Sequence, residues 1–372
     1  MSFPFKDYAD EARLKGRSQE FIQLTQQYAQ KLDNQGLPVI FTIEHFASQV
    51  KIPSNIIKSI LAYRNLQYIQ FRIKKRTGGY RQIMTPEKKL LYIQRWINKN
   101  ILQKIALLEC CTGFTPGTSL ATNGYIHRNS KKILKVDLAR FFDTINEKRV
   151  YGFFKHLGYH PNVAYDLALL TTAVPTYESW NSMDLEEIQA VGSKIQFDTA
   201  VLPQGAATSP QLANCIASSL DNRLLKLAIK NNCRYSRYAD DLVFSTPEAS
   251  GRLPSLSLVK KIIENEGFFI NHKKTGYFKE GMKQYVTGLT VTHGFHVSKA
   301  DRQEIFKHLY YAKKFGPFEH LNRWSKENGM KNEFPYGFKN WLLGKISFIY
   351  SIDFKVGKKM LAEFNEIAWG FE

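Results

Sequence analysis

Two adjacent aspartates, Asp240 and Asp241, occur in the run RYSRYADDLVFS, whose two halves have the pattern of paired β-strands. The sequence therefore predicts a hairpin with both carboxylates at its tip. Two like charges about 4 Å apart repel by roughly 4 kcal/mol at an effective dielectric constant of 20. A divalent cation removes this cost. Taken alone, the pair is better explained by an ordinary turn, so a metal site requires another carboxylate from a distant segment.

Asp137 supplies that carboxylate, because it lies at the end of an apolar strand predicted over residues 132–138. Mg²⁺ prefers oxygen ligands, typically one or two carboxylates together with substrate phosphates. Phosphoryl transfer uses two metal ions about 3.5–4 Å apart, one activating the attacking hydroxyl and one stabilising the leaving group. We therefore expect Asp137 and Asp240 to meet in space and to hold two magnesium ions.

Helices are predicted on both sides of these strands. Before them, the patterns indicate helices over 5–34, over 42–64 (split at Pro53–Ser54, with Ser54 as N-cap) and over 87–109, and a hairpin over 67–84 around Thr77-Gly78-Gly79. After residue 138, they indicate a helix from Asn146 to Leu157 that ends at Gly158, followed by a polar excursion over 178–199. A helix over 209–231, capped by Thr208 or Ser209, and a helix over 256–266 come next. The last predicted elements are strands over 268–279 and 284–292 and a basic helical segment over 299–371. This mixture predicts an α+β fold.

The charge balance indicates a polyanionic partner. Lys and Arg number 52 against 33 Asp and Glu, which gives a formal charge of +19. Such an excess attracts nucleic acids or an anionic membrane over long range, and 13% aromatic residues suit base stacking. The alternative is a solvated basic surface. In the C-terminal segment, Lys and aromatic residues interleave as in a surface that grips a duplex, or as in an amphipathic helical pack.

Other sequence features favour a cytoplasmic protein. The cysteines lack zinc-ligand spacing and are expected to be reduced thiols: Cys110, Cys111, Cys215 and Cys233. The first residues have no apolar core of a signal peptide. A run of about 18 apolar residues is absent, so we expect neither a membrane span nor a membrane partner.

Five ordered segments resemble the palm motifs of reverse transcriptases: KVDLARFF, LPQGAATSP (202–210), YADD, NHKKT (271–275) and YVTGL (285–289). With the basic hairpin 72–83, the resemblance covers most of residues 65–295. It implies a right-hand polymerase fold, with fingers and palm built on an RRM-like antiparallel sheet with helices, and a C-terminal helical thumb. The implied division is an N-terminal helical extension (1–64), fingers (65–131), palm (132–295, with fingers–palm elements over 160–210) and thumb (296–372).

The resemblance also implies catalytic roles. Asp137 and Asp240 would hold both Mg²⁺ ions, helped by the backbone carbonyl of Leu138. Asp241 directly follows Asp240 and faces the other way in extended chain, so it is expected to be a supporting carboxylate. Phe142 stands at the position that resembles the steric gate, where a ring beneath C2′ excludes a ribose hydroxyl; core packing is the alternative.

Further residues resemble those that bind the incoming deoxynucleotide. Lys74 and Arg81 would grip the triphosphate, since Arg suits bidentate phosphate contact. Gln204 and Gly205 would approach the nascent base pair, or form only a turn before a helix. Lys274 would protonate the leaving pyrophosphate. Lys273 is a rival for the role of Lys274, and a surface position is the alternative for either lysine. Lys75 and Arg76 are expected to face solvent or template.

Two short motifs point to the retron group of reverse transcriptases. Asn123-Gly124-Tyr125-Ile126-His127 resembles the Asn-Ala-x-x-His of retron enzymes, with Gly124 in place of Ala. Its Asn123 and His127 would anchor a loop or touch RNA. Val286-Thr287-Gly288 is the triplet typical of retrons and is a candidate RNA contact.

The retron resemblance implies a particular reaction. Such enzymes bind their own structured noncoding RNA, prime from a guanosine 2′-hydroxyl and copy part of the RNA into single-stranded DNA, giving branched msDNA. Host ribonuclease H removes the template, and an effector or toxin protein acts with the enzyme in anti-phage defence. Two alternatives stay open: a group II intron-like or diversity-generating reverse transcriptase, and a non-catalytic RNA- and DNA-binding scaffold that restrains a toxin.

Overall fold

A four-stranded antiparallel sheet lies at the centre of the molecule and carries the predicted carboxylates. The computed structural model describes residues 3–74, 80–176, 188, 191, 198–327 and 335–370. The sheet order is β4-β5-β3-β6, with bounds Arg234–Tyr238, Asp241–Thr246, Lys132–Leu138 and Ile270–Lys279. Pairing of β3 with β5 sets Asp137 opposite Asp241, so the predicted meeting of these two segments is confirmed.

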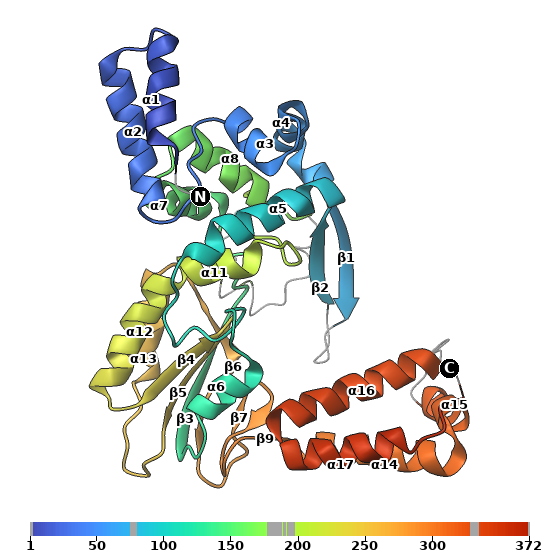
Figure 1. The fold of residues 1–372 in the computed structure, drawn as a ribbon. Helices are drawn as coiled ribbons and strands as arrows, with labels where there is room; N and C mark the ends of the chain where they lie inside the picture. Colours follow the sequence, from blue (N-terminus) through green and yellow to red (C-terminus); the bar gives the residue numbers. More distant parts are fainter. Residues whose placement is uncertain are drawn as a thin grey trace.

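The two faces of this sheet have different neighbours. On one face, Leu134 and Phe244 share a buried core with residues of α12 (Ser218–Lys230) and α13 (Leu256–Asn265), two helices that lie along the sheet in Figure 1. On the other face, Ile133 packs against a small sheet of three short strands: β7 (Tyr285–Val286), β8 (Leu289–Thr290) and β9 (His296–Val297). Because strand residues alternate between faces, Asp137 shares the face of Ile133, which α12 and α13 leave uncovered.

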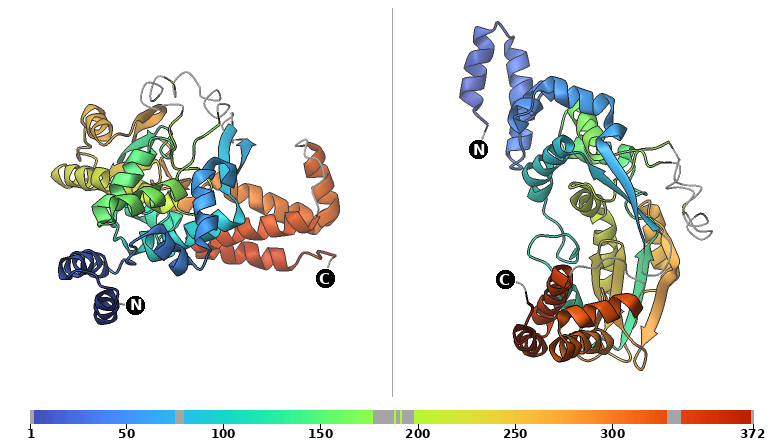
Figure 2. Two further views of the ribbon diagram at one scale, coloured as in Figure 1. Left: turned by 90° about the horizontal axis from the view of Figure 1, so that it is seen from above. Right: turned by 90° about the vertical axis from the view of Figure 1, so that its right-hand side faces the viewer.

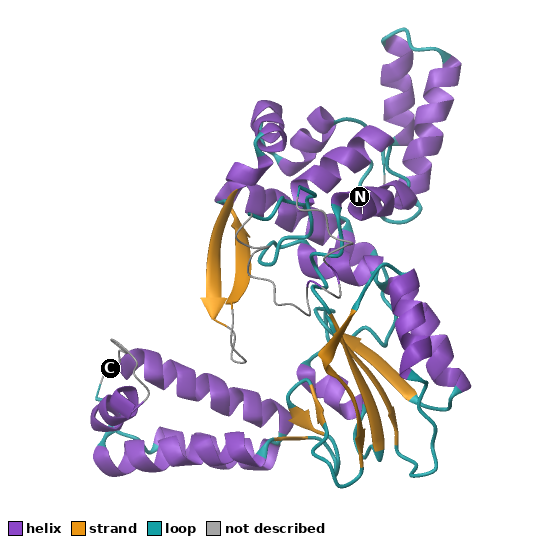
Figure 3. Ribbon diagram, turned by 180° about the vertical axis from the view of Figure 1, so that it is seen from behind, coloured by secondary structure: helices purple, strands orange, loops and turns teal. Residues whose placement is uncertain are grey.

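A helical layer lies beyond one end of this sheet, and a hairpin projects from it. The layer comprises α3 (Ile43–Val50), α4 (Ser54–Ala62), α5 (Lys88–Asn100), α7 (Glu147–Leu157), α8 (Pro161–Thr171) and α11 (Ser209–Ile216). The hairpin of β1 (Tyr68–Lys74) and β2 (Tyr80–Pro86) extends from this layer toward the C-terminal helices (Figures 1 and 3). Two 3₁₀ turns, η1 (Arg64–Gln67) and η2 (Leu102–Lys104), and helix α6 (Leu120–Ile126) complete this half.

The two ends of the chain form separate helical units. The C-terminal helices are α14 (Lys299–Phe315), α15 (Pro317–Glu327), α16 (Pro335–Ile352) and α17 (Phe354–Asn365). They bury their own core, which includes Leu309, Leu342 and Met360. At the opposite end of the molecule, α1 (Phe5–Leu14) and α2 (Gln19–Asp33) project as a pair (Figure 2). The predicted α+β class and the helical C-terminal segment are confirmed.

Residues 5–34 form two helices, and the predicted single helix is wrong. The chain turns at Gly16, whose φ is +69°. Ser18 then caps α2, because its hydroxyl accepts a hydrogen bond from the Phe21 N–H at 3.1 Å. A glycine after the end of one helix and a serine at the start of the next are typical helix-boundary residues. They were missed because the whole segment is rich in helix-forming residues.

The predicted strand over 284–292 is a tight hairpin. Thr287 and Gly288 lie between β7 and β8, with φ values of 48° and 83°. A type I′ turn requires positive φ at both central residues, and its twist matches that of the antiparallel strands it joins. Threonine rarely adopts a positive φ, so Thr287 gave no indication of the turn in the sequence.

Several helix ends differ from the prediction. Helix α4 begins at Ser54 itself, and Pro53 occupies the capping position without a side-chain bond. Helix α5 ends at Asn100, short of the predicted residue 109, and the stretch 209–231 divides at Ala217. The predicted cap at Asn146 and the end at Gly158 are confirmed.

Neither hydroxyl predicted to cap α11 does so. Thr208 makes no capping hydrogen bond, and the Ser209 hydroxyl donates to the Pro203 carbonyl at 2.8 Å. The Thr77-Gly78-Gly79 turn and nearly all of the 178–199 excursion lie outside the described residues. Within the described ranges, the structure has no helix with the length and apolar character needed to span a bilayer.

Candidate active site

Asp137 and Asp240 lie where the end of β3 meets the turn between β4 and β5. The Leu138 N–H donates to the Asp240 carbonyl at 2.9 Å, which ties the strand end to the turn. Ala239 adopts a φ of +55°, so the chain reverses sharply just before Asp240. Both aspartates line one cavity of about 820 Å³, which is bounded by the sheet, the β1–β2 hairpin and the loop before α11.

Burial and mutual repulsion disfavour the charged forms of these two carboxyl groups. Asp137 is 5% exposed, and burial, followed by the charge of Asp240, raises its pKa to about 7 against the opposing effect of Lys274. The pKa of Asp240 is also raised, first by burial and then by the charge of Asp241. Two partly desolvated carboxyl groups that oppose each other's ionisation favour the binding of a cation.

Asp241 has a partner from the chain itself. Its Oδ1 atom lies 3.0 Å from the Nζ atom of Lys135, and both side chains are half-buried. Asp137 and Asp240 line the cavity, whereas Asp241 is oriented toward this lysine. Asp241 pairs directly opposite Asp137 in the sheet, and its supporting role stays a prediction.

Three predicted cations surround the cavity. The Nζ atom of Lys274 in β6 lies 3.4 Å from each carboxylate oxygen of Asp137. Lys74 and Arg81 belong to the β1–β2 hairpin, and both are exposed and line the cavity. Adjacent strand residues face opposite sides, so Lys274, rather than Lys273, reaches the cavity. Lys75 and Arg76 lie outside the described residues.

Phe142 lies at the edge of both the core and the cavity. It packs partly against the main hydrophobic core, with its ring centroid 5.4 Å from that of Phe141 in an edge-to-face arrangement. It also lines the cavity that contains Asp137 and Asp240. The position of Phe142 is therefore compatible with both roles expected from the sequence, the steric gate and core packing.

The loop that contains Gln204 and Gly205 is docked on β2. The Met84 N–H donates to the Gln204 carbonyl at 2.8 Å. Gly205 has a φ of +120°, and a Cβ atom there would lie 3.0 Å from the Met84 carbonyl oxygen. Glycine thus allows a close approach to the β2 backbone, and contact of Gln204 and Gly205 with a nascent base pair stays a prediction.

Asn123 and His127 are fully buried. The two ring nitrogens of His127 lie 2.7 Å from the hydroxyls of Ser236 and Ser245, one on β4 and one on β5. The Asn123 carbonyl oxygen accepts from Ser236 at 2.6 Å. These side chains anchor helix α6 to the sheet, and the predicted direct contact with RNA is wrong for both, because neither reaches the surface.

The two retron-like motifs contact each other. The Asn123 amide lies 3.5 Å from the Thr287 hydroxyl. A Cβ atom on Gly124 would lie 3.0 Å from a methyl carbon of Leu289, so glycine leaves room for the β7–β8 hairpin against α6. Val286 is buried in the core, whereas Thr287 is half-exposed and Gly288 is exposed. Of the triplet, only Thr287 and Gly288 remain candidates for RNA contact.

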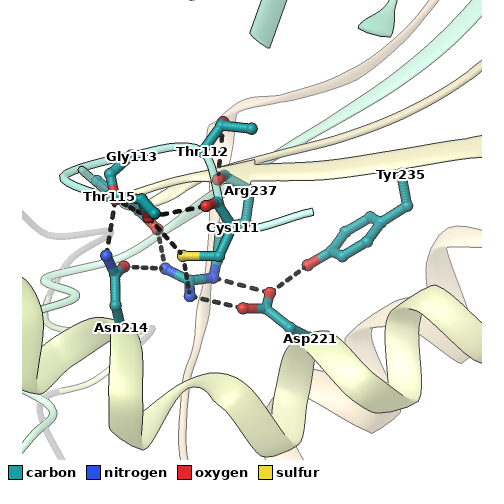
Figure 4. Close-up of polar contacts among 9 residues, drawn as sticks. Cys111, Thr112, Gly113, Thr115, Asn214, Asp221, Tyr235 and Arg237 are labelled. Carbon is teal, nitrogen blue, oxygen red and sulfur yellow. Dashed lines mark hydrogen bonds and ion pairs between the residues drawn. The ribbon is translucent and has the colours of Figure 1, made fainter. Parts of the chain in front are cut away.

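Two arrangements beside the carboxylates were not predicted. Arg140 has a φ of +47°, lines the cavity and pairs with Asp143 at 2.7 Å. Arg237 is fully buried and binds Asp221 and Asn214, two residues of different helices (Figure 4). A fully buried arginine requires a partner, because unpaired buried charges are rare. The sequence cannot identify that partner.

The oxygen donors at the strand ends fit a divalent cation. Within the described residues, no three or more His, Cys, Asp or Glu side chains gather as a complete metal site. Magnesium in phosphoryl-transfer sites nevertheless needs only one or two carboxylates, since phosphates and water supply the other ligands. The buried Asp137 is met by a lysine that is 57% exposed, so space remains for a cation beside Asp240.

Paired carboxylates on an antiparallel sheet, faced by a basic hairpin and followed by a helical unit, define the class of right-hand nucleic-acid polymerases. The family model for reverse transcriptase (RNA-dependent DNA polymerase) matches residues 73–307. The chain is 31% identical over 298 residues to the retron Mx65 reverse transcriptase of Myxococcus xanthus, covering 79% of this chain and 68% of that protein. It belongs to the reverse transcriptase family, and within it to the retron enzymes.

Two further relatives support this assignment. The retron Mx162 reverse transcriptase of Myxococcus xanthus is 31% identical over 314 residues, which cover 81% of this chain and 61% of that protein. The retron Ec86 reverse transcriptase of Escherichia coli is 27% identical over 344 residues, which cover 91% of this chain and 92% of that protein. The family consists of RNA-directed DNA polymerases that use divalent metal ions and an RNA template.

Proposed function

We propose that this chain copies part of a structured noncoding RNA into single-stranded DNA by two-metal phosphoryl transfer. The observation that carries the proposal is the presence of Asp137 and Asp240 in one cavity, beneath a basic hairpin. Asp137, Asp240 and the carbonyl of Leu138 would hold two Mg²⁺ ions. When bound, the ions would activate the attacking hydroxyl and stabilise the leaving pyrophosphate.

The side chains around the cavity would bind and select the deoxynucleotide. Lys74 and Arg81 are exposed and would neutralise the triphosphate, Arg81 by a bidentate contact. Phe142 would fill the space beneath C2′. Gln204 would contact the base pair with its side chain, since its carbonyl is already used by Met84.

Lys274 would act at the leaving group. Its side chain is more than half exposed and lies 3.4 Å from Asp137, so a short movement brings its ammonium group to a phosphate in the same cavity. There it would donate a proton to pyrophosphate. Asp241 would support the site through its ion pair with Lys135.

The retron-specific part of the proposal rests on the similarity to retron enzymes and on the exposed turn at Thr287 and Gly288. The enzyme would prime from a guanosine 2′-hydroxyl of its own RNA and yield branched msDNA, with host ribonuclease H removing the template. An effector protein would join it in anti-phage defence in the bacterial cytoplasm. We retain 1–64, 65–131, 132–295 and 296–372 as the proposed extension, fingers, palm and thumb.

An Asp240→Asn variant tests this function. We expect DNA synthesis in primer-extension assays to fall by at least about 10³-fold, because one of two metal-binding carboxylates loses its charge. Binding of any RNA that co-purifies with the enzyme should survive. Asp10→Asn, an equal change of charge on the exposed surface of α1, is the control and should retain activity. Retained synthesis by the Asp240 variant would refute the proposal, and sequencing of co-purified nucleic acid should reveal branched DNA.

A further inference from the structure

Arg237 is a charged side chain with no exposure to solvent, and it lies three residues before Asp240. Its guanidinium binds Asp221 of α12 through two bonds, Nε to Oδ1 at 2.8 Å and Nη2 to Oδ2 at 2.6 Å. Asp221 also accepts from the Tyr235 hydroxyl at 2.9 Å. Figure 4 shows this fork-to-fork pair beneath the strand. The orientation of the guanidinium is therefore fixed from the helix side.

The remaining donors of Arg237 point toward the catalytic turn. Its Nη1 atom donates to the Ala239 carbonyl at 3.2 Å and to the Asn214 side-chain oxygen at 2.9 Å. Its Nη2 atom lies 3.2 Å from the sulfur of Cys111. The left-handed backbone of Ala239 is disfavoured for an L-residue. A bond to the carbonyl of that residue helps to hold the turn in this conformation.

A neighbouring segment encloses the same turn. The Arg237 N–H donates to the Cys110 carbonyl at 2.7 Å, and the Thr112 N–H donates to the Arg237 carbonyl at 2.9 Å. A Cβ atom on Gly113 would lie 2.5 Å from the Ala239 nitrogen. The Asn214 amide donates to the Gly113 carbonyl at 2.7 Å, so one asparagine binds both the arginine and the segment packed on the turn.

Stability alone does not explain a buried ion pair at this position. Replacing such pairs by apolar residues of similar volume is often neutral or stabilising, because desolvation of two charges offsets their attraction. An apolar side chain could fill the space of Arg237, but it could not donate to the Ala239 carbonyl. The feature that requires arginine is thus its set of directed donors beside the turn.

We propose that Arg237, aligned by Asp221 and Asn214, is a positioning residue that holds the turn so that the Asp240 carboxylate is oriented for metal binding. This rests on the proposed function, in which Asp240 is a metal ligand. Arg237 itself touches no substrate, because it is fully buried. Groups that orient metal ligands typically change metal affinity by about 10–100-fold when they are altered.

Arg237→Lys tests the proposal, since it keeps a cation beside Asp221 but loses the planar fork. We expect Mn²⁺, measured by electron paramagnetic resonance without nucleotide, to bind about tenfold more weakly than to the unaltered enzyme. The Mg²⁺ concentration for half-maximal DNA synthesis should rise similarly, with little change in KM for deoxynucleotide. Added Mn²⁺, which protein ligands bind more tightly than Mg²⁺ in many sites, should partly restore kcat.

Arg149→Lys is the matched control. Arg149 of α7 is partly buried, and its guanidinium binds three backbone carbonyls away from the cavity, those of Thr144, Glu266 and Gly267. It should lower the thermal stability without changing Mn²⁺ affinity. If Arg237→Lys loses stability but keeps the Mn²⁺ affinity and Mg²⁺ dependence of the unaltered enzyme, the positioning role is refuted.

A second variant covers the case in which Arg237→Lys does not fold. Asn214→Ala leaves the Arg237–Asp221 pair in place but removes the link to Gly113, and it should weaken Mn²⁺ binding in the same direction by a smaller factor. Unchanged Mn²⁺ affinity in this variant would also overturn the inference. Asp240→Asn separates the two proposals. If this variant retains Mn²⁺ binding and DNA synthesis, the proposed function fails. If it loses both while the Arg237 and Asn214 variants bind metal normally, only the positioning role is refuted.

Discussion

Three aspartates within one strand pair have three different environments. Asp137 is nearly buried and lies 3.4 Å from the exposed Lys274, Asp240 lies in the turn, and Asp241 is paired with Lys135. Asp137 is the most buried of the three, since the end of β3 is tied to the turn between β4 and β5 by the hydrogen bond from the Leu138 N–H to the Asp240 carbonyl. Asp137 and Asp240 line the cavity, whereas Asp241 is paired with Lys135 outside the cavity lining, and the first two are the residues that we propose as metal ligands.

Phe142→Ala is expected to weaken the discrimination against ribonucleotides. The ring lines the cavity at the edge of the core, so its removal would leave room for a 2′-hydroxyl. We expect the preference for deoxynucleotides to fall by at least about tenfold, measured as a ratio of kcat/KM values, which corresponds to about 1.4 kcal/mol. Phe153→Ala, at the margin of the same core in α7, controls for lost packing. Equal discrimination in the variant and the unaltered enzyme would exclude the gate role.

His127 should make stability depend on pH. Burial, with a smaller effect of Arg234, lowers the pKa of His127 from 6.5 to about 3. Between pH 6.5 and about 3, the unfolded chain therefore binds a proton at His127 and the folded chain does not. The contribution of His127 to the free energy of unfolding is complete above pH 6.5 and is lost as pH falls toward 3. The slope from this one group reaches about 1.4 kcal/mol per pH unit.

Chemical denaturation of a His127→Gln variant between pH 7 and pH 4 measures this contribution. The variant should be less stable at pH 7 and should show a shallower loss of stability on acidification. His156→Gln, a change at an exposed histidine of α7, should retain the pH dependence of the unaltered protein. The same slope in both variants would contradict the assignment to His127.

At the residue scale, sequence predicts groups whose partners are local. Asn146 caps its own helix and Gly158 ends it, as expected from the sequence alone. Asp137 and Asp240 were predicted because metal chemistry requires two distant carboxylates. The partners of His127 and Arg237 lie on elements more than ten residues away, and no local pattern specifies them.

At the scale of elements, the active-site cavity depends on the docking of the loop before α11 on strand β2. One backbone hydrogen bond and one close contact join the loop to the strand, at Gln204 and Gly205. The loop also receives support from Gln94 of α5, whose side-chain oxygen accepts from the Ala207 N–H at 3.3 Å. The helical layer and the nucleotide site are therefore coupled through this loop.

Gly205→Ala should disturb this docking. The positive φ costs an L-residue roughly 1–2 kcal/mol, and the new methyl group would press on the β2 backbone. We expect a larger loss of unfolding free energy than for Gly117→Ala, whose φ is +78° but whose added Cβ meets nothing within 4 Å. Urea unfolding measures the difference, and single-nucleotide incorporation should fall only for Gly205→Ala. If both variants lost similar amounts of unfolding free energy, backbone strain alone would explain the loss, and the contact of Gly205 with β2 would not contribute to it.

Element boundaries were predictable where one residue carries the signal and were missed where the turn is unusual. Strand β3 agrees with the apolar run over 132–138, and β4 and β5 agree with the hairpin predicted around Asp240 and Asp241. The β7–β8 hairpin was missed because Thr287 adopts a positive φ that its side chain disfavours. Contact with Asn123 contributes to this conformation, and such tertiary support is invisible in a local sequence window.

At the scale of the whole molecule, the order of the helical and sheet units could be predicted, whereas their arrangement could not. The sequence indicates helices, then a mixed centre, then helices, and the structure has this order. The projection of the β1–β2 hairpin toward the C-terminal helices (Figure 1) depends on packing between distant segments. The charge of +19 is a property of the complete chain and bears on its partner more than on its fold.

RNA binding should therefore depend steeply on salt. A basic protein that neutralises several phosphates releases counterions, and about six to ten such contacts change affinity on the order of 10³–10⁵-fold between 50 and 200 mM salt for duplex DNA. We expect the affinity for the co-purifying RNA to fall at least about 10²-fold over this range, a smaller change because the slope per phosphate is lower for single strands. Filter binding with Asp240→Asn measures this without consumption of the template, and thermal unfolding at each salt concentration verifies that the fold persists. An affinity that is flat across the range would mean that base contacts and stacking hold the RNA, and that the excess of Lys and Arg is only a solvated surface.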